Sequence, residues 1–298
     1  MADIPSLSLG YKAHQAVLNW HQHSGSWARP LRWALIELPV RLLAQIESRR
    51  RGISFPRRAI GGWWWIWRFR FDIVMGFHEY PSVQWCRRLV RRGSTCLDIG
   101  SHIGYYSWIL SEITGPEGKV YSFEASPENF PVLVHNLRAT RATNVEPIHA
   151  AVADRGGTLP LHVSPGHSNH SLVRGYTDSK EIVHVPAVRI DEWLSARGVS
   201  RISFVKIDTE GAEIMVLEGM REVIRNSPDL VMLVELNPRA HRAAGRPPQK
   251  LLEVVADLGF EAREIDEWGR LNPPLTLAEP ATRNLLCCRP GYLDRTFG

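Results

Sequence analysis

The chain has 298 residues, of which 44% are hydrophobic and 22% are charged, and its net charge is +5. This balance is typical of a globular protein and excludes collagen-like and intrinsically disordered chains. No stretch reaches the ~20 uninterrupted apolar residues that span a bilayer. The amino terminus does not resemble a secretory signal, and the four cysteines have no Cys-x-x-Cys spacing. We therefore expect a cytoplasmic protein without a zinc site or a disulfide framework.

The charge is distributed unevenly along the chain. Residues 1–92 hold 15 Lys and Arg against 5 Asp and Glu, whereas the remaining residues hold 21 against 26. Eight of the 11 tryptophans also lie in residues 1–92. We therefore interpret residues 1–60 as a basic, partly helical N-terminal extension and residues 61–298 as the main domain.

The N-terminal region begins with an aperiodic, polar segment, residues 1–29, which we expect to be mobile. Pro30–Arg51 is predicted to be a helix, because polar side chains recur every four or five positions on an otherwise apolar cylinder. The segment Gly61–Phe71 ends in alternating apolar and basic side chains, which predicts a strand. Pro81–Arg92 is predicted to be a helix that leads into the rest of the main domain.

From Gly93 onwards, short apolar runs alternate with helical patterns. The predicted strands are Thr95–Ile99, Lys119–Glu124, Val145–Val152, Ser203–Asp208, Leu230–Leu236, Gly259–Ile265 and Arg283–Arg289. The predicted helices are Tyr105–Thr114, Pro127–Ala139, Gly211–Asn226 and Gln249–Leu258. This alternation predicts an α/β fold with a doubly wound, mainly parallel seven-stranded sheet and helices on both faces.

A different pattern separates the third and fourth of these strands. Thr158–Val163 and Ile182–Val188 are predicted to pair as antiparallel strands around the polar loop Pro165–Tyr176. Long polar loops in compact domains are often functional. We therefore expect this loop to contact a polar substrate.

The turn after the first strand of the sheet carries the first chemical motif. Asp98, Gly100 and Gly104 have the spacing Asp-x-Gly-x-x-x-Gly, which differs from the Gly-x-Gly-x-x-Gly of a dinucleotide site. Glycines let the backbone turn tightly and let a ligand approach it closely. An acid at the strand tip suits an adenosine ligand with a positively charged amino-acid end, which describes S-adenosylmethionine.

Three further acids follow the ends of later strands. Glu124 ends the second strand, where a carboxylate can accept both ribose hydroxyl protons. Asp154 follows the third strand and is placed to accept from the adenine amino group, although a solvated loop position is the alternative for this residue. Asp208 ends the fourth strand.

These blocks resemble the FkbM family of S-adenosylmethionine-dependent methyltransferases. The matching blocks are Leu97–Tyr106, Val120–Ala125, Ala151–Asp154 and Val205–Glu213, with Gly76–Tyr80 as a weaker match. The resemblance implies a class I, Rossmann-like methyltransferase domain that binds S-adenosylmethionine and mostly methylates oxygens of sugars and natural products. The cofactor-binding residues that we predict are Asp98, Gly100, Ser101, Gly104, Glu124, Ala125, Ala153 and Asp154.

Methyl transfer needs alignment of the sulfonium methyl with the acceptor oxygen and a group that takes the acceptor's proton. Glu210 is the first candidate for this base, because it lies just past the fourth strand. Asp208 and His102 are the other catalytic candidates. The alternative for Glu210 and Glu213 is that they complement the positive N-terminus of the next helix. His162, His167, His170 and His184, in and beside the polar loop, do not have the spacing of a standard set of metal ligands, so we expect no metal.

The basic, tryptophan-rich residues 30–92 have three interpretations. They form a helical cap on the main domain, they contact an anionic membrane surface through residues 30–70, or they bind nucleic acid. We rank them in this order and expect no nucleic-acid partner, because the acidic main domain would repel phosphates. A peripheral membrane location is compatible with the second interpretation.

The function that we predict is methyl transfer from S-adenosylmethionine to a hydroxyl of a small-molecule or glycan acceptor, such as a sugar or a secondary metabolite. An NAD-dependent oxidoreductase is the alternative enzyme, although the first turn lacks the dinucleotide glycines. A membrane-associated protein without activity and with a vestigial cofactor fold is the non-enzymatic alternative.

Overall fold

A computed structural model of the chain describes residues 8–23, 33–55, 63–166, 168–178, 181–275 and 281–297. Its helical elements are α1 (Leu9–His23), the π-helical turn η2 (Trp33–Glu37), α3 (Leu38–Arg51), α4 (Trp63–Met75), α5 (Tyr80–Leu89), α6 (Tyr105–Thr114), α7 (Asn129–Ala139), α8 (Ile190–Ser195), α9 (Glu213–Glu218), α10 (Arg221–Asn226), α11 (Pro238–Ala243), α12 (Gln249–Asp257) and α13 (Tyr292–Phe297).

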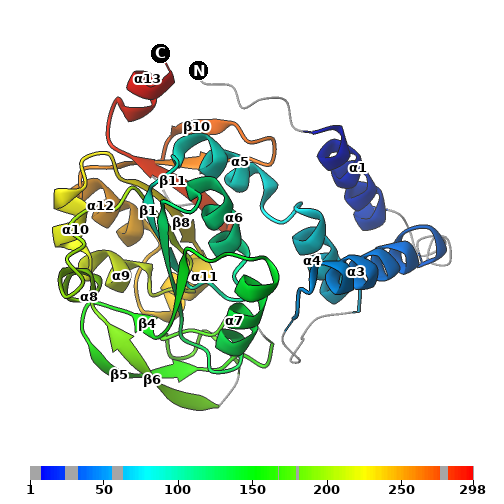
Figure 1. Cartoon of the computed structure of the whole chain (residues 1–298), viewed down its shortest axis with the longest axis horizontal. Helices are drawn as coiled ribbons and strands as arrows, with labels where there is room; N and C mark the ends of the chain where they lie inside the picture. The colour runs from blue at the N-terminus through cyan, green and yellow to red at the C-terminus, as the bar shows by residue number, and fades with distance from the viewer. Residues whose placement is uncertain are drawn as a thin grey trace.

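The central sheet has eight strands in the order β10-β9-β11-β8-β7-β1-β2-β3 (Figure 1). Its strands are β1 (Thr95–Ile99), β2 (Lys119–Glu124), β3 (Val145–His149), β7 (Phe204–Ile207), β8 (Val231–Leu236), β9 (Glu261–Ile265), β10 (Leu271–Pro274) and β11 (Arg283–Cys288). Strands β3, β2, β1, β7 and β8 are parallel, and β11, β9 and β10 pair antiparallel. The seven predicted strands and the mainly parallel sheet are confirmed, and β10 adds an eighth strand at one edge.

Strand β1 lies where the strand order reverses, with β2 on one side and β7 on the other. In open α/β sheets, ligands bind beyond the carboxyl ends of the strands at such a reversal. The topology therefore predicts a ligand site beyond Ile99, between the segments that follow β2 and β7.

Different helices cover the two faces of the sheet. Leu97 and Ile99 of β1 pack with side chains of α8, α9, α10 and α12, whereas Cys96 packs with side chains of α5, α6 and α7. Because strand side chains alternate between faces, Asp98 projects toward the α5–α6 side. There its carboxylate accepts a hydrogen bond from Ser107 Oγ of α6.

Two predicted elements are divided in the structure. The predicted strand Val145–Val152 leaves the central sheet at Ala150, and β4 (Ala151–Val152) joins β5 (Gly157–His162) and β6 (Ile182–Val188) in a separate sheet. The predicted helix Gly211–Asn226 is split into α9 and α10 at Gly219. The Asp191 carboxylate accepts hydrogen bonds from the first-turn N–H groups of α10, which gives this short helix its cap.

One prediction for the N-terminal region is wrong, because the described part of the strand expected in Gly61–Phe71 belongs to helix α4. The aperiodic segment 1–29 contains helix α1, and its expected mobility stays a prediction. Tertiary packing overrides the alternating pattern, because α4 lies along α3 and its Phe71 and Ile73 are buried. Helix α1 packs on the same region, where Tyr11 stacks on Tyr80. Helices α1, α3 and α4 form a group beside the sheet (Figure 1).

We expect Gly219→Ala to lower the free energy of unfolding by about 1–3 kcal/mol through overpacking. The added Cβ would lie 2.2 Å from the carbonyl oxygen of Ala153. The φ angle of −76° at Gly219 suits alanine, so backbone strain does not contribute. Denaturant unfolding measures the difference. Gly156→Ala is the control, because a Cβ added at Gly156 would lie 3.6 Å from the nearest neighbouring atom. Equal stability of the two variants would contradict this close packing.

Candidate active site

A cavity lies beyond the carboxyl ends of β1, β2 and β7. The space within it that water-sized molecules can occupy is about 220 Å³. The sheet side of its wall contains Gly100, Glu124, Asp208 and Glu210. Further parts of the wall come from three segments far apart in the sequence, which contribute Phe69 and His78, Ala150 to Val152, and Ser168 to His170.

The two glycines of the first turn have positive φ angles, 84° at Gly100 and 88° at Gly104. A Cβ at Gly100 would lie 1.8 Å from Asp208 O, and a Cβ at Gly104 would lie 2.7 Å from Leu133 Cδ1. Both positions therefore require glycine because of neighbouring protein atoms. Only Gly100 also lines the cavity, as the predicted close approach of a ligand requires.

Asp98 lines a smaller hollow next to the cavity, together with Ser101, Tyr105 and Lys206. Burial raises the pKa of Asp98 to about 6, although the hydrogen bond from Ser107 and the nearby Lys206 oppose this shift. The Ser101 hydroxyl donates to the Asp98 carbonyl oxygen at 2.7 Å, which closes the turn. The hollow places a buried acid where the amino-acid end of S-adenosylmethionine was predicted.

Glu124 connects the ends of β1 and β2. Its Oε2 accepts from the His102 backbone N–H and its Oε1 from the Ser126 N–H, both at 2.7 Å. The Asn129 side chain also hydrogen-bonds to this carboxylate, which leaves one lone pair for a ribose hydroxyl. Burial raises the pKa of Glu124 to about 7, against the lowering effect of these three hydrogen bonds. The neighbouring Ala125 also lines the cavity, as predicted for both residues.

Ala153 and Asp154, both predicted to bind the cofactor, do not line the cavity, so the geometry does not support the adenine contact predicted for Asp154. Asp154 is exposed, and its carboxylate lies 3.6 Å from Arg155 Nη1. The reason is the early end of β3, because the chain turns at Ala150 and presents Ala150 to Val152 to the cavity instead. The alternative of a solvated loop position describes Asp154.

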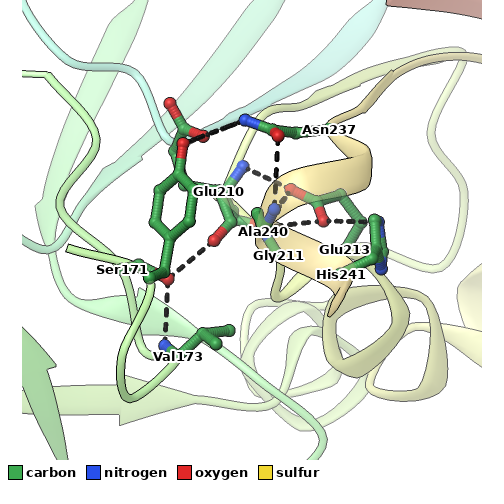
Figure 2. Close-up of polar contacts among 10 residues, drawn as sticks. Ser171, Val173, Glu210, Gly211, Glu213, Asn237, Ala240 and His241 are labelled. Carbon is green, nitrogen blue, oxygen red and sulfur yellow. Dashed lines mark hydrogen bonds and ion pairs between the residues drawn. The ribbon is translucent and has the colours of Figure 1, made fainter. Parts of the chain in front are cut away.

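Glu210 faces the cavity from the turn after β7. The Tyr176 hydroxyl donates to its Oε2 at 2.7 Å, and Asn237 Nδ2 donates to the same atom at 2.8 Å (Figure 2). Burial and the neighbouring Asp208 raise the pKa of Glu210 to about 7. A buried carboxyl that titrates near neutral pH is suited to accept a proton.

Glu213 braces the turn that carries Glu210. Its carboxylate accepts hydrogen bonds from the N–H groups of Thr209 at 2.9 Å and Gly211 at 3.0 Å. Its Oε2 also lies 3.2 Å from His241 Nε2, and neither side chain is exposed. The alternative predicted for both acids is a place at the positive N-terminus of the next helix. Glu213 has this place, at the start of α9, whereas Glu210 faces the cavity.

Asp208 pairs with Lys206, whose Nζ lies 3.2 Å from Asp208 Oδ2. One oxygen each of Asp208, Glu210 and Glu235 lies within 4.8 Å of the other two, a spacing that could hold a metal ion. Asp208 and Glu210 already have hydrogen-bond donors, and burial with the two neighbouring acids raises the pKa of Glu235 well above its usual value. We assign no ion to this group, and a metal-independent reaction stays a prediction.

His102 also lines the cavity and has a positive φ angle of 51°. Its ring centroid lies 5.9 Å from that of Phe69, which belongs to α4. Asn237 follows the fifth predicted strand, where the sequence places it within reach of the acceptor, and Tyr176 ends the predicted polar loop, but nothing in the sequence indicates Phe69 or joins the three residues in one site. The polarity of the loop before Tyr176 was the available indication for that residue, whereas the position of Phe69 depends on the packing of α4.

We expect Glu124→Gln to weaken the binding of S-adenosylhomocysteine roughly 10- to 100-fold, because hydrogen bonds to a charged acceptor contribute about 1.5–3 kcal/mol. Ribose hydroxyls donate best to the ionised carboxylate, so wild-type affinity should rise as the pH increases through about 7, the pKa of Glu124. The variant should show a smaller slope. Isothermal titration calorimetry over this range measures both effects.

The control for this experiment is Glu117→Gln, which removes an exposed carboxylate from the loop before β2. It should bind S-adenosylhomocysteine as the wild type does. Wild-type affinity of Glu124→Gln at every pH would contradict the ribose role of Glu124.

The chain is similar to known proteins in both sequence and structure. Over 207 residues it is 28% identical to the methyltransferase sdnD of Sordaria araneosa, with 58% of this chain and 76% of that protein covered. It is 26% identical to the hexuronic acid methyltransferase AglP of Haloferax volcanii, with 59% and 65% covered. It is also 26% identical to the 31-O-demethyl-FK506 methyltransferase FkbM of Streptomyces tacrolimicus, with 45% and 62% covered.

Among solved structures, the precorrin-6y C5,15-methyltransferase of Geobacter metallireducens is 13% identical with a TM-score of 0.41, and 71% of this chain and 88% of that chain are covered. This likeness is too distant to bear on activity. The family model described as the methyltransferase FkbM domain matches residues 98–262, more than half of the chain. An NAD-dependent oxidoreductase and a non-enzymatic protein are thereby set aside. The chain belongs to the FkbM methyltransferase family and is an enzyme that uses S-adenosylmethionine as its cofactor.

Proposed function

We propose that the protein transfers a methyl group from S-adenosylmethionine to a hydroxyl of a sugar or a secondary metabolite. The observation that carries this proposal is the Glu210 carboxyl, which lies in the cavity wall with a pKa raised by burial to about 7. The names of two relatives support an acceptor of this kind, since one is a hexuronic acid methyltransferase and one acts on 31-O-demethyl-FK506.

The described residues fit the three parts of the cofactor. Glu124 would hold the ribose, the buried Asp98 would face the amino-acid end, and the wall from Ala150 to Val152 would lie along the adenine. When bound, the cofactor supplies an electrophilic methyl group on a positively charged sulfur. The cluster of acids at this edge of the sheet favours that charge electrostatically.

In this proposal Glu210 acts as the general base. As the acceptor oxygen forms its bond to the methyl carbon and the carbon–sulfur bond breaks, the hydroxyl proton passes to Glu210. Asp208, held by Lys206, is a positioning group in the same wall, and His102 is the second candidate for the base. Ser168, Asn169 and His170 offer polar groups to a hydroxyl-rich acceptor.

We expect an untargeted comparison of metabolites, with and without the active enzyme, to reveal a compound that gains the mass of one methylene group. With that acceptor, Glu210→Gln should lower kcat roughly 10²- to 10⁴-fold, the usual contribution of a general base. Its affinity for S-adenosylhomocysteine should stay near that of the wild type. Glu253→Gln is the control, because Glu253 is an exposed residue of α12. An unchanged kcat in Glu210→Gln would refute Glu210 as the base.

We also propose that residues 30–70 contact an anionic membrane surface. Helix α3 and the turn before it expose apolar side chains next to basic ones, and the exposed fractions are 67% for Leu35, 48% for Leu42, 45% for Leu43 and 57% for Ile46. The same helix ends in three arginines. An apolar stripe beside arginines suits binding in the plane of an anionic surface. Within the described ranges, none of the helices could cross a bilayer.

Flotation of the full chain tests this contact. The wild type should float with vesicles of phosphatidylcholine and phosphatidylglycerol, and less with phosphatidylcholine alone. The combined change Leu42→Ser, Leu43→Ser and Ile46→Ser should reduce flotation, because each removes exposed apolar area. Ile182→Ser, at an exposed residue of β6, is the control. Wild-type protein that remains in the unbound fraction with both vesicles would exclude the proposal.

A further inference from the structure

We infer that Tyr176 and Asn237 are positioning residues for Glu210. They saturate one oxygen of its carboxylate, Oε2, and leave Oε1 to face the acceptor. The inference rests on the proposed role of Glu210 as the base. Tyr176 comes from the polar loop between β5 and β6, and Asn237 follows β8, so two distant segments meet at one carboxylate (Figure 2).

The three side chains form a closed triangle of hydrogen bonds. Tyr176 Oη and Asn237 Nδ2 both donate to Glu210 Oε2, and Asn237 Nδ2 lies 2.9 Å from Tyr176 Oη. None of the described residues donates to Glu210 Oε1. A carboxylate with one oxygen occupied by two donors accepts a further proton at the other oxygen.

The orientation of Asn237 is determined by its own helix. Its Oδ1 accepts a hydrogen bond from the Ala240 N–H at 3.3 Å and so caps α11. Because the amide oxygen is occupied in this way, the amide nitrogen must point away from the helix, toward Glu210. Figure 2 shows the Asn237 side chain between Ala240 and the Glu210 carboxylate.

The backbone of Glu210 is held as firmly as its side chain. Its φ angle of 53° lies in the left-handed region, which non-glycine residues rarely adopt. The Ser171 hydroxyl donates to the Glu210 carbonyl oxygen at 2.6 Å. The Glu213 carboxylate accepts hydrogen bonds from the N–H groups of Thr209 and Gly211, on either side of Glu210. The loop that supplies Tyr176 therefore also holds the backbone of Glu210 through Ser171.

The charges around Glu210 explain why these donors matter. The titratable groups that face it are Asp208 after β7, Glu213 of α9, Glu235 of β8 and Tyr176 of the loop. The three acids disfavour a negative charge on Glu210, whereas the hydrogen bonds from Tyr176 and Asn237 stabilise that charge. Burial and Glu210 raise the pKa of Tyr176, so its hydroxyl stays protonated and keeps donating. Loss of a donor should therefore raise the pKa of Glu210.

The direct test measures the titration of Glu210 in the full chain bound to S-adenosylhomocysteine. The Cδ resonance of ¹³C-labelled glutamate, assigned by its absence in Glu210→Gln, reports the pKa. Tyr176→Phe should raise this pKa by about one unit, since one hydrogen bond to a charged group contributes about that much. Asn237→Asp should raise it further, because it replaces a donor by an acid and still offers an oxygen to cap α11.

Tyr292→Phe is the matched control, because Tyr292 lies in α13, far along the chain from the site. With the acceptor found by the metabolite comparison, the acid limb of kcat should move to higher pH in Tyr176→Phe, and KM for S-adenosylmethionine should not change. A merely structural role would lower kcat equally at every pH.

The possible failures are distinct. An unchanged Glu210 pKa in both Tyr176→Phe and Asn237→Asp would overturn this inference, even if Glu210→Gln were inactive. A fully active Glu210→Gln would overturn the proposed role of Glu210 as the base, and a metabolite comparison without a methylated product would overturn the proposed function. If one of the two variants fails to fold, the other one decides the result.

Discussion

The buried ammonium group of Lys206 is the charge on which the acidic edge of the sheet depends. Its side chain is 2% exposed, and its Nζ contacts Asp208 Oδ2 at 3.2 Å and Asn284 Oδ1 at 3.0 Å. Although burial alone would lower the pKa of Lys206, the carboxylates of Asp208, Glu79 and Glu235 raise it, so the lysine remains charged. A buried charge without its partner costs several kcal/mol, so Lys206 and the acids around it lower the cost of burying one another.

The two turns that form the site have the same design. In each one a buried carboxylate accepts backbone N–H groups and fixes a residue with a positive φ angle, Glu124 for His102 and Glu213 for Glu210. Charge-assisted hydrogen bonds of this kind are stronger than neutral ones and hold the strained backbone in place. Acids in this protein therefore fix the shape of the site as well as face its ligands. Glu213 only fixes the shape of the turn that carries Glu210.

The cavity is completed by the region before the family match. Phe69 of α4 and His78 line it, and His14 of α1 contacts Asp72 of α4 at 2.9 Å. Helix α4 therefore packs at the cavity, as a helical cap would, and the role of residues 30–92 as a cap stays a prediction. The exposed apolar residues of α3 lie on the same group of helices, α1, α3 and α4 (Figure 1).

The sequence by itself determined the alternating strands and helices and the acids at the ends of β1, β2 and β7, because hydrophobic periodicity and glycine turns are local properties. Only the tertiary structure decided where α4 and β4 lie. The alternation of aromatic and basic residues up to Phe71 suits a strand, but in the structure α4 is a helix that packs along α3, and His14 of α1 contacts its Phe71 and Asp72. Asp154 is excluded from the cavity for the same kind of reason, because the chain turns at Ala150 to pair with β6. The contacts of Tyr176 and Asn237 with Glu210 join residues 34 and 27 positions apart, and no local pattern encodes contacts over such separations.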